Sequence, residues 1–401
     1  MKKREMKKTG NPGRKRQLLA VFAAAILSAG CLPGMTVNIC ADSVNEYYED
    51  STAIKTAKEL MNMKSDGTYH LADDIDLSGV KWHSIRNFKG TFDGNGYEIK
   101  NLTSSTYGLF SSVGSNAVIK NVKLTNADIK SKYKTVGAVV SVINEKVQNV
   151  EIDNCFVSGV VASCMKKYGK SSSSSTAGAI VGKNSSESSV ISDCYSNAVV
   201  CAERQVGGII GYNKGTVMNS GFGGVIENSK NIYELVADEN GEMTDDYTYM
   251  YCYGGICGYN YGTVESCLSN YTDMACGKYA GGIVGAAMKN GKITGCLNLT
   301  KMCLNDGMYP GLISGYASKK SEITNTCSRE PNNSMTVDIV GKTAGKFKVS
   351  LIPLDKLGNK ENLKVLGDKW SIENETPVLV SIKDYISLEK TSTIKGGRLT
   401  A

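Results

Sequence analysis

Short apolar runs that begin with glycine recur along the chain and alternate with polar segments. Seven such runs occupy residues 108–110, 137–140, 178–182, 207–211, 254–258, 281–285 and 311–315. Their first glycines are 29, 41, 29, 47, 27 and 30 residues apart. A period near 30 residues with strand-like content is typical of a stacked array, in which each unit buries its apolar side against its neighbours. The pattern therefore predicts an all-β solenoid.

Equivalent positions of the repeat carry equivalent residue types. A large apolar residue stands two positions after the first glycine, and a small residue stands four positions after it. Stacked strands lie roughly 4.8 Å apart, so such positions form continuous columns. We predict a structural ladder made of Ile180, Ile209, Ile256, Ile283 and Ile313. A right-handed parallel β-helix over residues 68–333 fits this spacing better than a propeller, whose blades need roughly 40–50 residues.

The two ends of the array differ from the repeat. Residues 51–64 have the apolar spacing of a helix that Ser51 or Thr52 could cap, and we predict a capping helix within residues 42–67. Such a helix would shield the first coil from edge pairing. The glycine pattern stops at residue 334, and strands are expected at residues 347–354 and 370–382. We predict that residues 334–401 form a C-terminal β cap and tail.

Thirteen cysteines would ordinarily suggest disulfides in an exported chain. Five of them follow the second apolar position of their own unit by three to five residues: Cys155, Cys194, Cys267, Cys296 and Cys327. One small, apolar thiol per coil suits an interior column, because a free cysteine packs as a compact hydrophobe. We favour such a ladder over disulfides. A metal site is not expected, since no Cys-x-x-Cys pair occurs and His70 and His83 lie far upstream.

The N-terminal residues have the pattern of a bacterial Sec-type signal peptide. Eight basic residues precede an apolar stretch at residues 18–30, and cleavage is expected before Asp42, giving a signal peptide of residues 1–41. A lipoprotein box ending at Cys31 is the alternative. Of 46 basic and 39 acidic residues, 8 and 1 lie before residue 18, so 38 of each remain. The remainder is neutral, which gives no reason to expect nucleic acid as a partner. No second apolar segment is long enough to span a membrane.

Two long spacings mark insertions, at residues 165–176 and 227–252, and solenoid insertions often form the binding side. Residues 227–253 combine acids with tyrosines that alternate along an extended strand. Tyrosine rings with hydroxyls suit sugars or a protein partner. The candidate ligand contacts are Tyr233, Tyr247, Tyr249, Tyr251, Tyr253, Asp245 and Asp246. A solvated excursion without a ligand and a calcium loop at residues 238–242 are the alternatives.

Catalytic signatures are few. The sequence has no zinc-protease, serine-hydrolase, phosphate-loop or dinucleotide motif. Asp73, Asp74 and Asp76 come closest to the paired carboxylates of a carbohydrate-cleaving enzyme. However, Asp74 and Asp76 alternate with Ile75 and Leu77, which indicates a half-exposed strand. We predict no enzymatic activity and no cofactor.

Residues 207–220 and 254–267 resemble the GLUG-motif repeat of bacterial surface proteins. The lead-in at residues 74–77 and 88–102 and the closing segment around Trp370 and residues 377–379 resemble the same family. The resemblance covers most of residues 52–382. It implies a secreted, adhesin-like repeat protein, and it supplies no catalytic residues. Relatives often have Trp-x-Pro-Ile-Gly where this chain has Trp82-His83-Ser84-Ile85-Arg86.

These features lead to the hypothesis of a secreted or cell-surface, non-enzymatic module that binds an extracellular glycan or protein. We expect it to be a monomer. Two alternatives stay open from the sequence. One is a polysaccharide lyase or glycoside hydrolase on the same scaffold, and the other is a passive stalk that holds other parts away from the cell.

Overall fold

The computed structural model describes residues 50–163, 175–228, 251–270, 273–274, 278–300, 309–329, 337–343, 347, 349–353 and 356–389. The chain divides into two units, Met1–Thr52 and Ala53–Ala401. Only residues 50–52 of the first unit are described, so the predicted signal peptide and Cys31 lie outside the described residues. None of the helices in the described part is both long and apolar enough to cross a bilayer.

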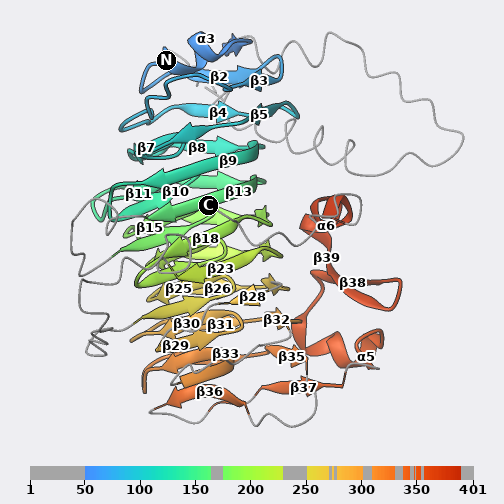
Figure 1. The fold of residues 1–401 in the computed structure, drawn as a ribbon. Coiled ribbons are helices and arrows are strands. Elements are labelled where there is room, and N and C mark those ends of the chain that lie inside the picture. Colours follow the sequence, from blue (N-terminus) through green and yellow to red (C-terminus); the bar gives the residue numbers. More distant parts are fainter. Residues whose placement is uncertain are drawn as a thin grey trace, which may run out of the picture. The chain divides into compact units, whose positions relative to one another are not determined.

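The second unit is a parallel β-helix, as predicted, and its strands stack into three long sheets (Figure 1). Sheet A contains β1 (Thr52–Ile54), β2 (Thr68–Leu71), β4 (Thr91–Asp93), β8 (Val118–Lys120), β12 (Glu151–Asp153), β16 (Val190–Ser192), β21 (Thr216–Met218), β26 (Thr263–Glu265), β31 (Lys292–Thr294) and β34 (Glu322–Thr324). Sheet B contains β3 (Ile75–Asp76), β5 (Glu98–Lys100), β6 (Thr103–Ser104), β9 (Lys123–Ser131), β13 (Phe156–Ser163), β17 (Tyr195–Ser196), β18 (Val199–Ala202), β22 (Gly221–Phe222), β23 (Val225–Asn228), β27 (Leu268–Ser269), β28 (Asp273–Met274), β32 (Leu297–Asn298), β35 (Cys327–Arg329) and β37 (Ser350–Ile352). Sheet C contains β7 (Phe110–Val113), β10 (Thr135–Gly137), β11 (Val140–Ile143), β14 (Thr176–Gly178), β15 (Val181–Asn184), β19 (Gln205–Gly207), β20 (Ile210–Asn213), β24 (Cys252–Gly254), β25 (Cys257–Asn260), β29 (Tyr279–Gly281), β30 (Val284–Ala287), β33 (Tyr309–Ala317) and β36 (Asp338–Thr343).

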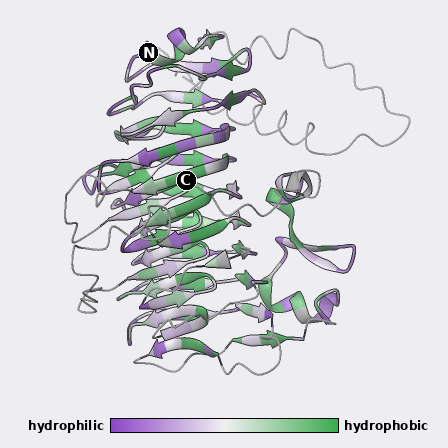
Figure 2. Cartoon of the chain, viewed as in Figure 1, coloured by the Kyte–Doolittle hydropathy of each residue, from purple (hydrophilic) through white to green (hydrophobic). Residues whose placement is uncertain are grey.

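Each coil of the repeat passes through sheets C, A and B in that order, and its apolar residues face the space between them. In sheet A, the middle residue of strands β8 to β34 is buried while its neighbours are more exposed, as Val217 and Val264 illustrate. This alternation is what a strand with one buried face requires. Hydrophobic residues therefore recur along the strands of successive coils (Figure 2). The result is one continuous core rather than separate globules.

The repeated glycines are needed where the strand pairs of sheet C pass close to one another. A Cβ atom added to Gly258 would lie 2.7 Å from the carbonyl oxygen of Gly211 and 2.8 Å from the backbone nitrogen of Val206. A Cβ on Gly211 would similarly lie 2.7 Å from the carbonyl oxygen of Ala177. Any larger residue would push backbone atoms apart, because real Cβ contacts of this length do not occur in packed interiors. The small-residue position of the repeat thus sets the distance between neighbouring coils.

The N-terminal helix is shorter than predicted. Residues 52–54 form strand β1, and the helix α3 spans only Ala57–Met61. Thr56, and not Ser51 or Thr52, is the N-cap, and its side chain forms a capping box with Glu59. Leu60 is buried at the first coil. The apolar spacing over 51–64 was therefore misread as helical at its start, because Ile54 belongs to a strand.

The C-terminal part also differs from the predicted boundary at residue 333. Strands β36 and β37 continue the parallel stack, because β36 pairs with β33 and β37 pairs with β35. The following residues do not close the end of the stack. They form α5 (Lys360–Leu363), the short 3₁₀ helices η3 (Lys364–Leu366) and η4 (Val380–Ile382), the antiparallel hairpin β38 (Trp370–Glu373) and β39 (Thr376–Leu379), and α6 (Lys383–Glu389).

This C-terminal segment, residues 356–389, packs against the outer side of sheet B (Figure 1). Its apolar residues Leu379 and Ile382 are fully buried against sheet B residues such as Leu297. A Cβ on Gly221 would lie 2.3 Å from Cδ1 of Ile382, so this glycine leaves the space that Ile382 fills. The segment therefore covers one side of the β-helix.

Candidate binding face

The predicted isoleucine positions form one column inside the β-helix. The backbone N–H of Ile180 donates to the carbonyl of Ile209 (3.1 Å), and the same contact joins Ile209 to Ile256 (3.0 Å). The series continues from Ile256 to Ile283 (2.9 Å) and on to Ile313 (3.0 Å). All five side chains are fully buried. The column fixes the register in which outward-facing residues of successive coils must also stack.

Four of the predicted cysteines also share a column in the core. Cys155, Cys194, Cys267 and Cys296 are fully buried, and Ser220 stands between the second and the third. Each thiol donates a hydrogen bond to the carbonyl oxygen of the residue two positions earlier in the sequence, with Sγ–O distances of 3.0–3.3 Å. Burial raises the pKa of Cys194 and Cys267 well above the ordinary range. The eight cysteines in the described part of the chain are free thiols.

Cys327 does not belong to this column, which corrects the prediction. Its backbone N–H donates to the carbonyl of Cys296, and its partner in the sheet is Leu297, the residue after Cys296. Thr326 instead occupies the column, with its hydroxyl donating to the carbonyl of Thr324 (2.8 Å). A shift by one residue sends a strand side chain to the opposite face. Cys327 therefore lies on the outer side of sheet B, under the C-terminal segment.

The structure separates the tyrosines that the sequence placed on one strand face. Tyr253 is fully buried, and its hydroxyl donates to the carbonyl of Glu203 (2.9 Å). It cannot offer its ring to a ligand, so this candidate contact is corrected to a core residue. Tyr251 is half-buried, with the guanidinium of Arg204 over its ring at 5.4 Å. The other candidates, Tyr233, Tyr247, Tyr249, Asp245 and Asp246, lie outside the described residues, as does the 238–242 segment.

A different set of tyrosines gathers on the outer side of sheet C. The stacked pairs are Tyr212 with Tyr259, whose ring centroids lie 6.0 Å apart, and Tyr279 with Tyr309, at 5.4 Å. Tilted contacts at 5.4–5.8 Å join further rings to these pairs. We call this surface the tyrosine face, and it consists of Tyr212, Tyr259, Tyr261, Tyr279, Tyr309 and Tyr316. It covers the buried side chains of Cys252 and Ala286.

The tyrosine face follows from the repeat. Tyr212, Tyr259 and Tyr316 each stand five residues after the first glycine of their unit, and Tyr279 and Tyr309 stand two residues before it. Pairing in register places Tyr212 beside Tyr259, and Ala286 between Tyr259 and Tyr316. The neighbouring Asn184, Asn213 and Asn260 point inward, and hydrogen bonds of 3.3 and 3.0 Å between their side-chain amides join them into a ladder. Alternation along each strand therefore sends asparagine in and tyrosine out.

Lysines flank the tyrosine face at both ends. The ammonium group of Lys183 lies 4.9 Å from the ring centroid of Tyr212, and that of Lys342 lies 4.8 Å from Tyr309. Both distances suit cation–π attraction. Lys278 also lies over a ring of the face, that of Tyr279, at 5.8 Å. The surface thus combines rigid amphipathic rings with positive charge.

The rings are half-buried rather than freely exposed, except for Tyr279, which is 5% exposed. Burial raises the pKa of Tyr212, Tyr259 and Tyr279, and neighbouring tyrosine hydroxyls add to the rise for each of them. These hydroxyls therefore stay protonated at neutral pH and can both donate and accept hydrogen bonds. A neutral, hydroxyl-bearing aromatic surface suits the alternating apolar and polar faces of a sugar ring.

An open groove of about 630 Å³ adjoins the tyrosine face. Tyr212 and Tyr261 line it together with Lys214, Lys289 and Glu187. Lys214 forms an ion pair with Glu145 (2.9 Å), which lowers the pKa of that carboxyl. The groove therefore extends the ring surface toward further charged groups.

Segments that leave the repeat enter sheet C beside this face. Residues 229–250 connect β23 of sheet B to Tyr251 and β24 of sheet C. Tyr251 accepts a backbone hydrogen bond from Tyr279 (2.9 Å), a member of the tyrosine face. Residues 301–308 likewise lead into Tyr309. The described residues that follow these segments, Tyr251 and Tyr309, thus lie next to or within the tyrosine face.

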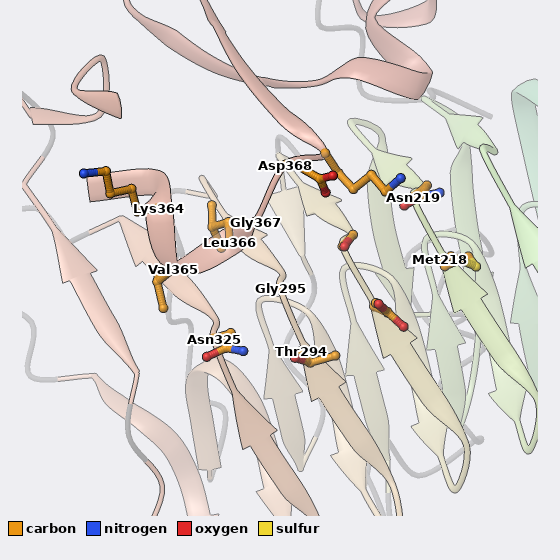
Figure 3. Close-up of a pocket in the computed structure, with 13 residues that line it drawn as sticks. Met218, Asn219, Thr294, Gly295, Asn325, Lys364, Val365, Leu366, Gly367 and Asp368 are labelled. Carbon is orange, nitrogen blue, oxygen red and sulfur yellow. The ribbon is translucent and has the colours of Figure 1, made fainter. Parts of the chain in front are cut away.

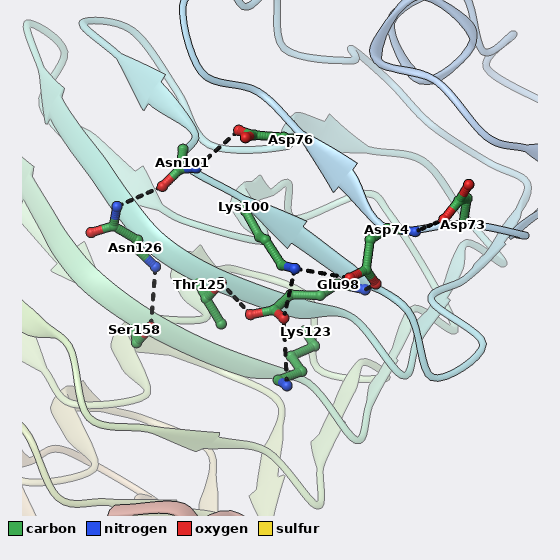
Figure 4. A network of polar contacts seen from close by, with 10 residues as sticks. All are labelled: Asp73, Asp74, Asp76, Glu98, Lys100, Asn101, Lys123, Thr125, Asn126 and Ser158. Carbon is green, nitrogen blue, oxygen red and sulfur yellow. Dashed lines mark hydrogen bonds and ion pairs between the residues drawn. The ribbon is translucent and has the colours of Figure 1, made fainter. Parts of the chain in front are cut away.

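The acidic cluster near the N-terminus serves structural contacts (Figure 4). Asp74 pairs with Lys100 (2.8 Å) and accepts the backbone N–H of Glu98 (2.9 Å). Asp76 accepts the amide of Asn101 (2.9 Å), and its hydrogen bonds lower its pKa to about 2. A carboxyl with so low a pKa is a poor proton donor at neutral pH. Among the described residues no group of three or more His, Cys, Asp or Glu is arranged to hold a metal ion.

A second groove lies between a corner of the β-helix and the C-terminal segment (Figure 3). It has a volume of about 500 Å³ and is lined by Asn219, Ser266 and Gly295 on one side and by residues 364–369 on the other. Asn219, Ser266 and Gly295 have φ values of 50°, 49° and 63°, so the chain turns sharply at this corner. The lining is polar and open, without a buried charged side chain.

Sequence reasoning missed the tyrosine face although its signal was present. Tyr212-Asn213 and Tyr259-Asn260 recur after the glycine bend, which is the sequence signal of stacked columns. The asparagines at these positions point into the core and hold the coils together, whereas the tyrosines point outward. Tyr279, Tyr309 and Tyr316 could have been found by extending the column alignment to the positions two before and five after the first glycine, whereas Tyr261, seven residues after Gly254, lies outside both positions.

No family model matches the chain. In sequence, the chain is similar to Halomucin of Haloquadratum walsbyi, at 33% identity over 103 residues. That alignment covers 21% of this chain and 1% of Halomucin, so the chain spans only a small part of that protein's length. In structure, the chain is similar to a putative immunoglobulin A1 protease from Bacteroides ovatus, with a TM-score of 0.51 and 20% sequence identity. The match covers 82% of this chain and 92% of the other, and it shows a shared fold.

Proposed function

We propose that this protein is a GLUG-type repeat protein that is exported and binds an extracellular glycan or protein through the tyrosine face, without catalysing a reaction. The carrying observation is the set of six partly buried tyrosines on one outer side of the β-helix. Their rings are held in place by stacking, so a ligand meets a surface whose side chains need little further ordering.

Three further features support the proposal. The N-terminal residues have the pattern of a signal peptide, although they lie outside the described residues. Tyr251, the first described residue after the insertion at 227–252, accepts a backbone hydrogen bond from Tyr279 of the tyrosine face, and solenoid insertions often form the binding side. The carboxylates of Asp74 and Asp76, the nearest approach to a catalytic pair in the sequence, are occupied with structural hydrogen bonds.

The binding role is tested by removing rings from the face. The double variant Tyr212→Ala/Tyr259→Ala should weaken binding to recognised ligands by at least about tenfold, since each lost aromatic contact contributes about 0.5–1.5 kcal/mol beyond its area burial. Binding is measured on a glycan array and on immobilised extracellular proteins. The deletion of residues 229–250 shows whether the insertion shares in the site.

The matched control is Tyr107→Ala/Tyr133→Ala, which removes a stacked pair (4.6 Å) from the N-terminal coils. Equal loss of binding in this control would place the site elsewhere than on the tyrosine face. Unchanged binding in Tyr212→Ala/Tyr259→Ala would reject the face altogether. Release of reducing sugar or unsaturated products from a polysaccharide panel would instead favour an enzyme on this scaffold.

A further inference from the structure

One outward-facing column of sheet C has an arrangement of residues that indicates which class of ligand the tyrosine face binds. In register, it reads Lys183, Tyr212, Tyr259, Ala286, Tyr316 and Lys342. The tyrosines are flanked by a lysine on each side, and beyond Lys183 the column continues with Val142 and Ser112. Because stacked strands lie roughly 4.8 Å apart, the two lysines are separated by about 24 Å along the stack.

The two terminal lysines are available for a ligand's charge. Among the described residues, neither Lys183 nor Lys342 forms an ion pair, and the contact that each makes is with a tyrosine ring. An ammonium over a ring still presents hydrogen-bond donors outward. Two acids lie near the Lys183 side of the column: Glu145, which pairs with Lys214, and Glu187 in the adjoining groove. Lys214 and Lys289 in the same groove offset these acids.

The spacing of the column favours a long ligand over a small one. A single sugar ring covers about one tyrosine, whereas the column offers rings on three of four successive coils, with a lysine beyond them on each side. A linear chain of sugars that lies along the stack can contact all of these positions together, and its many weak contacts then act at high effective concentration. Carboxylate groups at intervals along such a chain would meet Lys183 and Lys342.

We propose that the tyrosine face binds a linear, acidic polysaccharide laid along the axis of the β-helix, with sugar rings on the tyrosines and carboxylates at Lys183 and Lys342. This proposal rests on the proposed function and names the ligand class for the same site. It predicts selectivity for charged over neutral forms of one backbone, which the binding role alone does not require.

The test compares polymers that differ only in charge. Polygalacturonate, alginate and hyaluronan are each paired with a derivative whose carboxyl groups are esterified or reduced, and affinity for the full-length protein is measured by biolayer interferometry. At least one acidic polymer should bind at least about tenfold more tightly than its neutral partner. That preference should shrink when salt rises from about 0.1 M to 1 M, since the Debye length then falls from roughly 10 Å to 3 Å.

Variants separate the two parts of the site. Lys183→Gln/Lys342→Gln should bring the affinity for the acidic polymer down to that for its neutral partner and leave the neutral partner unchanged. Tyr212→Ala/Tyr259→Ala should weaken both. The matched control is Lys360→Gln/Lys383→Gln, which removes the same charge from exposed positions of the C-terminal segment.

Equal binding of acidic and neutral forms, or equal effects of the two lysine variants, would overturn the proposal. So would the failure of all three acidic polymers to bind. In each of these cases the proposed function still stands if the tyrosine variant weakens binding to any other ligand. The proposed function is rejected together with the ligand class only if Tyr212→Ala/Tyr259→Ala leaves the binding of every ligand unchanged.

Discussion

The outer sides of sheet B and sheet C both carry apolar columns built by the same repeat, but within the described residues only the sheet B column is covered by another part of the chain. On sheet B, Phe156, Tyr195 and Leu297 are 5%, 2% and 0% exposed because residues 356–389 cover them. On sheet C, Tyr212, Tyr259 and Tyr316 are half-buried, and no described residues outside the stack cover them. The first side has become part of the core, while the second keeps aromatic rings accessible.

The composition of each column explains the difference. The sheet B column consists mainly of aliphatic and aromatic side chains, and burying such apolar surface stabilises the folded state by roughly 25 cal/mol per Å². Covering it stabilises the fold, and Gly221 leaves the space that Ile382 needs. In the sheet C column, lysines flank the tyrosines and the tyrosines carry hydroxyls, and burying these polar groups without partners would oppose folding. The C-terminal segment therefore covers the outer side of sheet B, where burial stabilises the fold more than it would on sheet C.

The largest expected effect tests whether both sides belong to one stack. Ile256→Asp places a carboxylate in the interior column, where it meets no cation, and should lower the free energy of unfolding by about 3–5 kcal/mol. Urea unfolding followed by circular dichroism measures the change. The control Thr263→Asp, on the outside of sheet A in the same coil, should change it by about 0.5 kcal/mol or less. Similar values for the two variants would contradict the column alignment.

A smaller effect should distinguish the covered side from the open one. Ile382→Ala removes a fully buried side chain from the contact between the C-terminal segment and sheet B. It should lower stability by about 2–4 kcal/mol, as is usual for isoleucine-to-alanine changes in cores. The counterpart Tyr316→Ala, on the half-buried tyrosine face, should lower it by less. Urea unfolding of both variants provides the comparison.

Thiol labelling reports on the same contact. Cys327 lies under the C-terminal segment, and burial raises its pKa to about 11, whereas Cys194 lies in the core column. In Ile382→Ala, Cys327 should react with a thiol reagent at denaturant concentrations that leave Cys194 protected, because the segment detaches before the stack unfolds. Simultaneous labelling of both cysteines would show that the segment and the stack unfold together.

The sequence predicted what repeats and failed where repetition stops. The isoleucine column and four cysteines lie where the period placed them, because each coil imposes its register on the next. Cys327 was misplaced by one residue, since the last coil has Thr326 in its column and nothing local distinguishes the two. The side-on packing of residues 356–389 could not be read from the period, because it joins residues that lie far apart in sequence.

The candidate site was only partly predictable for a related reason. The insertion at 227–253 drew attention because it is unusual, and Tyr253 seemed to continue its alternation. However, Tyr253 is the inward residue of β24, so its ring belongs to the core. The outward tyrosines are regular members of the repeat. The period alone does not show whether a repeated position points into the core or outward. A binding surface built from repeated positions is therefore hard to distinguish in sequence from a core column.

The smallest expected effect concerns a carboxyl beside the covered side. Asp193 turns the chain with a φ of 53°, at a position where neighbouring coils have Asn154 and Asn219. Burial and the nearby Asp153 raise its pKa, while the neighbouring side chains of Ser381, in the C-terminal segment, and Asn219 oppose the rise. The folded state therefore holds the Asp193 proton more tightly than the unfolded chain does. The stability that this provides is complete below the unfolded value and is lost as the pH rises through the raised pKa.

Asp193→Asn should consequently raise the melting temperature at pH 7, by about 1–2 °C, and flatten its dependence on pH on the acidic side. Asparagine adopts positive φ readily, so the turn itself is retained. Asp76→Asn provides a control of opposite sign, because hydrogen bonds lower the pKa of Asp76 to about 2 and the charged form is the one stabilised at pH 7. Differential scanning fluorimetry between pH 4 and pH 8 measures both. If Asp193→Asn melts below the wild type at pH 7, the carboxylate stabilises the contact with Ser381, and the covered side is held by charge as well as by apolar burial.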